Sequence, residues 1–187
     1  WNMRGNVLVA CGRYEDALLS YDRIIDIDPG FSGAWFNRGN MLAALGRHEE
    51  ALAAYDQAIA LDPRYAEAYN NRGTTCMALG HPADAAGSFF AAVSLRPDYV
   101  EAWYNHGYAL SELGRHEDAI ISFDAALRQR PAYAEAWYNQ GAALAALGRD
   151  EEAVASYDQA IALNPDDAGA RKARGNALRR LGREAAT

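Results

Sequence analysis

A strict 34-residue period constrains the fold of this chain more than any other feature. Gly39, Gly73 and Gly107 are 34 residues apart. Four further positions recur with the same step: an aromatic residue before that glycine, a second glycine, an alanine and a second aromatic residue. A proline closes each unit. The first aromatic series is Trp1, Trp35, Tyr69, Trp103 and Trp137, and the second is Tyr21, Tyr55, Phe89, Phe123 and Tyr157. A period between 20 and 50 residues is the signature of repeat proteins, so we expect a stack of similar small units.

Each unit has the pattern of two helices. In the second unit, apolar residues at helical spacing predict a first helix over residues 32–45. Gly46 follows, and glycine ends helices well because it adopts the left-handed conformation at no steric cost. A second helix is predicted from Glu49 to Leu61, and Pro63 stops it. In the third unit Pro82 stands where the second helix begins, a position that tolerates proline.

A pair of helices cannot bury its apolar face alone, so the units must stack on one another to form a core. The sequence therefore predicts an all-α solenoid of antiparallel helix pairs and one domain over residues 1–187. The predicted repeats are 1–31, 32–65, 66–99, 100–133 and 134–167, with one extra helix in a partial repeat over 168–187. The small residues Gly39 and Ala51 are expected where the two helices approach most closely.

Charge and composition narrow the class of protein. The net charge is −7, and a nucleic-acid-binding domain needs a basic surface, so we expect no nucleic-acid partner. Only residues 171–187 are basic, with six basic residues and Glu184. No apolar run is long enough to span a bilayer, so we expect no membrane partner. A single lysine among many arginines is typical of a high-GC bacterial genome.

Cysteine and histidine usage indicates neither a disulfide framework nor a metal site. Cys11 and Cys76 stand where other repeats carry leucine, so we interpret both as small core residues in a reducing, cytoplasmic setting. The histidines are dispersed and are expected on the surface; they are His48, His81, His106 and His116. No nucleophile motif, phosphate loop or metal spacing is present, so we predict no enzyme activity, no cofactor and no metal.

These repeated residues resemble the tetratricopeptide repeat (TPR) family, whose 34-residue unit carries the same Trp, Gly, Ala, aromatic and Pro positions. The resemblance covers essentially the whole chain. It departs at the residue before the first glycine, which is usually leucine in the family. Here that position holds Arg38, Arg72, His106 and Gln140. The family implies a right-handed superhelix in which the first helix of each repeat lines a concave groove.

Asparagine recurs at one position of four successive first helices, although it is a poor helix former. The row is Asn37, Asn71, Asn105 and Asn139. An amide donates and accepts hydrogen bonds, so such a row suits a peptide main chain. The row is similar to the asparagine ladder of O-GlcNAc transferases. The alternative is that each asparagine bonds the neighbouring repeat. Other groove residues implied by the resemblance are Phe36, Asn40, Asn70, Tyr104, Tyr108 and Tyr138.

The sequence thus indicates a non-catalytic scaffold that binds a protein or an extended peptide in its groove. One alternative is the substrate-recruiting segment of a larger enzyme, such as a bacterial glycosyltransferase resembling the O-GlcNAc enzyme. Another is a self-assembling structural module. The chain begins inside a repeat, so we expect it to be a fragment. We also expect head-to-tail association through its ends, where Trp1, Leu8 and Leu178 are predicted to lie on uncovered stacking faces.

Overall fold

The computed structural model describes residues 1–182, apart from the side chains of Asn2 and Asn6. Within this range the chain forms helices joined by short turns and contains no strand, which confirms the predicted all-α arrangement of helix pairs. The chain divides into two compact units, an N-terminal unit (Trp1–Pro97) and a C-terminal unit (Asp98–Thr187). The single continuous domain stays a prediction. Arg183 and Glu184, counted above in the basic end, lie outside the described residues.

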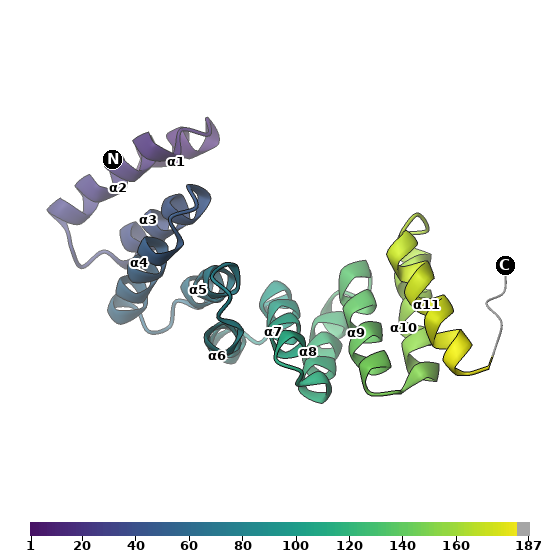
Figure 1. Cartoon of the computed structure of the whole chain (residues 1–187). Helices are drawn as coiled ribbons and strands as arrows, with labels where there is room; N and C mark the ends of the chain where they lie inside the picture. Colours follow the sequence, from purple (N-terminus) through teal and green to yellow (C-terminus); the bar gives the residue numbers. More distant parts are fainter. Residues whose placement is uncertain (183–187) are drawn as a thin grey trace. The chain divides into compact units, whose positions relative to one another are not determined.

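Figure 1 labels the helices in chain order. Those of the N-terminal unit are α1 (Asn2–Ala10), α2 (Tyr14–Ile27), α3 (Ser32–Ala44), α4 (His48–Leu61), α5 (Ala66–Ala78) and α6 (Pro82–Leu95). Those of the C-terminal unit are α7 (Val100–Glu112), α8 (His116–Gln129), α9 (Ala134–Ala146), α10 (Asp150–Leu163) and α11 (Ala168–Arg180). Within each unit every helix packs against the next helix in the chain. The odd-numbered helices are therefore the predicted first helices and the even-numbered ones the second.

The turn inside each repeat depends on its glycine. Gly46 has φ of +74°, and the glycines at the same repeat position also have positive φ, a conformation that side chains with a Cβ rarely adopt. After this turn the second helix has acidic residues in its first turn, such as Glu49 and Glu50 in α4. Their negative charge interacts favourably with the positive end of the helix dipole. Pro82 is the first residue of α6, as predicted.

The core of each repeat is an aromatic ring packed on a glycine. Tyr55 is 1% exposed, and a Cβ added to Gly39 would lie 2.6 Å from its Cε1 atom. The same arrangement recurs in the following repeats for Phe89 on Gly73, Phe123 on Gly107 and Tyr157 on Gly141. The predicted close approach at Gly39 is therefore an approach to the ring of the second helix. Ala51, one turn before Tyr55, is fully buried.

Two predictions about buried residues were wrong. Cys76 is buried, but Cys11, the C-cap residue of α1, is exposed, whereas Leu45 at the same repeat position is partly buried against the core. Leu8 and Leu178, expected on uncovered end faces, are each only 8% exposed. Trp1 is 54% exposed.

Candidate functional site

A pocket of about 260 Å³ lies on the first helices of the N-terminal unit and brings predicted site residues together. It is lined by Asn40 and Ala43 from α3, Tyr55 from α4, and Asn71, Thr74 and Thr75 from α5. Asn40 and Asn71, both predicted as groove residues, come from different repeats. The stacking of α5 beside α3 and α4 therefore creates this pocket.

Hydrogen bonds fix the orientation of the Asn40 amide. Its Oδ1 atom accepts from Nδ2 of Asn71 at 2.8 Å and from the hydroxyl of Tyr55 at 2.9 Å. Burial raises the pKa of Tyr55, so this hydroxyl stays protonated and can donate. With the oxygen held by two donors, both N–H groups of Asn40 remain without a partner among residues 1–182.

The neighbouring polar groups of α5 complete this hydrogen-bond network. Asn70 donates from Nδ2 to Oδ1 of Asn71 at 3.2 Å. The hydroxyls of Thr74 and Thr75 donate to the main-chain oxygens of Asn70 and Asn71, at 3.1 Å and 2.9 Å. Each hydroxyl has one proton, so the Thr74 oxygen is left as an acceptor. The pocket thus offers donors and acceptors, and none of its lining side chains is charged.

In the C-terminal unit, two other predicted residues bond to each other. Asn139 of α9 donates from Nδ2 to the hydroxyl of Tyr104 of α7 at 2.9 Å. The Tyr104 ring packs against Tyr133 and Phe123, with centroids 4.9 Å and 6.0 Å away, and burial raises its pKa. The Tyr138 ring lies 5.8 Å from that of Tyr157. These rings serve packing as well as presenting an aromatic surface.

The remaining predicted residues are placed less specifically. Phe36 packs on Tyr65 with centroids 4.8 Å apart, and Tyr108 is 42% exposed. Asn37 and Asn105 are half-buried. Asn71 and Asn139 both donate to a side chain of the preceding repeat, which is the alternative role that the sequence left open. The asparagine row falls into one pair in each unit, and its continuity over four repeats stays a prediction.

Sequence reasoning missed a second polar row, which ties successive repeats together. Nε of Arg38 donates to Asp22 at 2.8 Å, and Nε of Arg72 donates to Asp56 at 2.7 Å. In the C-terminal unit the equivalent pairs are Gln140 with Asp124 and Arg174 with Asp158. These are the positions that depart from the family leucine. The matching aspartates stand at 34-residue steps except in the third repeat, where Phe90 takes their place, and this spacing was the signal that could have revealed the row.

His106 occupies the same position in α7, and its expected surface placement was wrong. The ring is half-buried, and its Nδ1 atom lies 3.0 Å from the hydroxyl oxygen of Ser122. The same hydroxyl also lies within hydrogen-bond distance, 3.1 Å, of the main-chain oxygen of Asp118. Burial, assisted by the nearby charge of Arg115, lowers the pKa of His106 to about 4.

Residues 1–182 hold no group of three or more histidine, cysteine or acidic side chains arranged for a metal ion. In the same part of the chain, no helix combines the length and the apolar character that crossing a membrane requires.

Known structures of similar fold match most of the chain. "YrrB: a TPR protein with an unusual peptide-binding site" is 28% identical, with a TM-score of 0.82 over 91% of this chain and 88% of that one. MamA is 22% identical, with a TM-score of 0.82 over 88% and 96%. TTC0263, a thermophilic TPR protein of Thermus thermophilus, is 25% identical, with a TM-score of 0.65 over 94% and 96%. No curated protein matches the chain.

Family models match nearly the whole sequence. The TPR repeat model matches residues 5–46 and 39–80, and a second tetratricopeptide-repeat model matches 70–133, 104–168 and 151–186. Together with the helix pairs, the aromatic residues packed on glycines and the turns at Gly46 and its equivalents, these matches establish the family. The chain belongs to the tetratricopeptide repeat family and has the helical solenoid fold of a protein-interaction scaffold.

Proposed function

We propose that this chain is a non-catalytic scaffold that binds an extended peptide along its first helices, with the pocket of Asn40 and Asn71 as one anchoring point. The observation that carries the proposal is the fixed amide of Asn40, whose oxygen is held internally while its two N–H groups remain available. The similarity to YrrB, described as having an unusual peptide-binding site, supports it.

The chemistry of the pocket matches a peptide main chain. A peptide group offers one C=O and one N–H. Asn40 can donate to the C=O, and the oxygen of Thr74 can accept from the N–H. These contacts use no side chain of the ligand and no charge, so we expect weak dependence on ligand sequence and on salt at this point. Rings such as Tyr104, Tyr108 and Tyr138 provide further contact area in the C-terminal unit.

The resemblance of the asparagine row to the O-GlcNAc transferase ladder suggests the same kind of main-chain contact. If the chain serves as the substrate-recruiting segment of a larger enzyme, the peptide is the substrate and the first helices still hold it. Both forms of the proposal therefore require the same peptide contact.

A displayed random-peptide library, selected on the intact chain, would supply a probe for calorimetry. In Asn40→Asp, the carboxylate keeps an acceptor for Asn71 and Tyr55 but removes both N–H donors. We expect this variant to bind the selected peptide about three- to tenfold more weakly, because one hydrogen bond contributes roughly 0.5–1.5 kcal/mol.

The matched control is Gln57→Glu, which makes the same amide-to-acid change at an exposed position of α4 outside the pocket. It should leave the dissociation constant unchanged. Failure to select any peptide, or equal affinity for wild type and Asn40→Asp, would contradict the proposal.

A further inference from the structure

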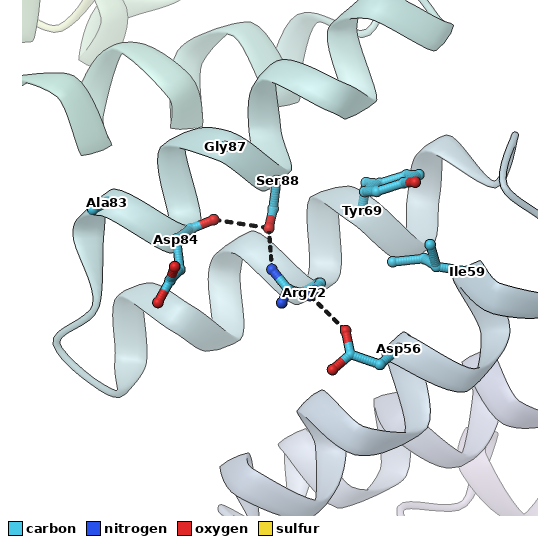
Figure 2. A pocket seen from close by; sticks show the side chains of 8 residues that line it. All are labelled: Asp56, Ile59, Tyr69, Arg72, Ala83, Asp84, Gly87 and Ser88. Atoms are coloured by element: carbon cyan, nitrogen blue, oxygen red, sulfur yellow. Dashed lines mark hydrogen bonds and ion pairs between the residues drawn. The ribbon is translucent and has the colours of Figure 1, made fainter.

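A second pocket, of about 420 Å³, lies between α4, α5 and α6 of the N-terminal unit, and Asn40 and Asn71 take no part in it. Its lining consists of Asp56, Ile59, Tyr69, Arg72, Ala83, Asp84, Gly87 and Ser88. Figure 2 shows Arg72 between Asp56 and Ser88, with Tyr69 and Ile59 on one side and Asp84 on the other. The pocket therefore combines an aromatic ring, charged groups and open space.

The positive charge of Arg72 is already matched inside the pocket. Its Nε donates to Asp56 at 2.7 Å, and its Nη1 donates to the hydroxyl of Ser88 at 2.7 Å. The Ser88 hydroxyl in turn donates to the main-chain oxygen of Asp84 at 2.9 Å. The lining contains one guanidinium and two carboxylates, so its net charge is negative. The uncompensated charge is that of the Asp84 carboxylate.

Comparison with the other repeats shows that Asp84 has lost its usual partner. The acidic residue at this position elsewhere pairs with an arginine three residues earlier. These pairs are Arg13–Asp16, Arg47–Glu50, Arg115–Asp118 and Arg149–Glu152, with nitrogen–oxygen distances of 2.5 to 2.6 Å. In the third repeat the arginine is replaced by His81. Asp84 makes no ion pair within residues 1–182, and its carboxylate is exposed beside the pocket.

Two further departures from the repeat occur in the same pocket. Tyr69 replaces tryptophan, whose indole nitrogen at Trp35 and Trp137 donates to a proline oxygen. The Tyr69 hydroxyl makes no hydrogen bond within the described chain. Gly87 stands where the other repeats carry Leu19, Ala53, Ile121 and Ala155, and a Cβ added there would meet nothing within 4 Å. The third repeat thus differs from its siblings in three ways that affect one pocket. Gly87 leaves the pocket open, Tyr69 adds a hydroxyl group, and His81 leaves the charge of Asp84 unpaired.

We propose that this pocket binds an arginine side chain of a partner protein. A guanidinium can stack on the ring of Tyr69 and pair through its planar N–H groups with the Asp84 carboxylate. The net negative lining disfavours an anion, and the net charge of −7 attracts a basic partner. The lining includes no residue of the proposed peptide pocket, so the two sites can be tested independently.

The experiment titrates the ¹⁵N-labelled intact chain with Nα-acetyl-arginine methylamide and follows the amide signals of Tyr69 and Gly87 by NMR. The citrulline analogue, which has nearly the same shape but no charge, is the control ligand, and the lysine analogue tests guanidinium against ammonium. We expect saturable shifts with arginine and at most one third of its affinity for the other two.

Two variants test the mechanism. His81→Arg restores the ion pair found in the sibling repeats and should weaken arginine binding about two- to fivefold, the range for one exposed charge pair. Gly87→Ile adds to the pocket lining the bulky side chain that Ile121 provides at the same repeat position, and should weaken arginine binding by obstructing access to the pocket. Ala53→Ile, at that position in the second repeat, is the control and should bind as wild type does.

Several outcomes would overturn the proposal: no saturable shift with arginine, equal affinity for citrulline or lysine, or unchanged affinity in both His81→Arg and Gly87→Ile. Thermal melting of Gly87→Ile, monitored by circular dichroism, establishes that a loss of binding does not come from a loss of folding.

Discussion

A single repeat position, the residue before the glycine of each first helix, shows how side chains of different chemistry serve one purpose. Arg38, Arg72, His106 and Gln140 all hydrogen-bond a residue of a second helix. Arg72 and Gln140 each bond both an aspartate of the preceding repeat and a serine of their own repeat. The position requires a polar end group that is long enough to hydrogen-bond the second helix. The residue type can therefore vary between repeats.

At the residue scale, we predict that His106 makes stability depend on pH. Its pKa is about 4 in the folded chain, whereas an unperturbed histidine titrates near pH 6.5. As the pH falls from about 6.5 to about 4, the unfolded chain gains a proton that the folded chain does not, so stability is lost across this window and levels off below it. The stabilisation is fully present above about pH 6.5.

The matched variant is His106→Gln, which copies the residue found at Gln140 and cannot titrate. Urea unfolding at pH 7.5 and pH 5 should show a larger loss of unfolding free energy for wild type than for the variant. If the two proteins lost the same amount between these pH values, His106 would not be the titrating group.

At the scale of the helix pair, the ring of each second helix dictates the glycine of the first. A Cβ on Gly73 of α5 would lie 2.7 Å from Cε1 of Phe89, so alanine there must displace a buried ring. In α11, Gly175 occupies the same repeat position, but a Cβ there would meet nothing within 4 Å among the described residues. The need for glycine therefore comes from the partner helix, whereas the glycines of the turns are required by their own backbone conformation.

We predict that Gly73→Ala and Gly87→Ala change stability in opposite directions. Gly73→Ala should destabilise by about 1–3 kcal/mol through overpacking. Gly87→Ala, in the next helix of the same repeat, should stabilise by about 0.5–1 kcal/mol, because alanine is the better helix former and the space is open. Urea denaturation of both variants measures the difference. Equal midpoints for the two would show that the ring of Phe89 is not the constraint on Gly73.

At the scale of the whole molecule, α1 presents a surface that interior repeats bury. Val7 is 62% exposed, whereas the residues at its repeat position, Met41, Thr75, Ala109 and Ala143, are all at most 6% exposed. Trp1, the N-cap residue of α1, is also 54% exposed. An apolar face of this kind is suited to contact with another chain.

The predicted self-association through the chain ends can be tested on this surface. Val7→Glu should lower the weight-average mass measured by light scattering at high protein concentration, because a charge would have to be buried in the contact. Leu19→Glu is the control: Leu19 is 64% exposed, but its repeat counterpart Ile121 is exposed as well, at 62%. A strictly monomeric wild type, or equal masses for the two variants, would remove the support for this association.

The repeat, the helix pairs and their turns could be predicted from the sequence, because these depend on local spacing and backbone conformation that a 34-residue period makes visible. The sequence pattern placed Gly46 and Pro82 correctly, and the family resemblance named Asn40 and Asn71 as groove residues. The packing of the helices was needed to show that the Asn40 oxygen is occupied and its N–H groups available, that His106 is half-buried, and that Cys11 is exposed. The packing also showed that Asp84, Tyr69 and Gly87 line one pocket. These properties depend on which side chains of different helices meet, and a repeat pattern shows the shared positions but not the partners that each side chain finds.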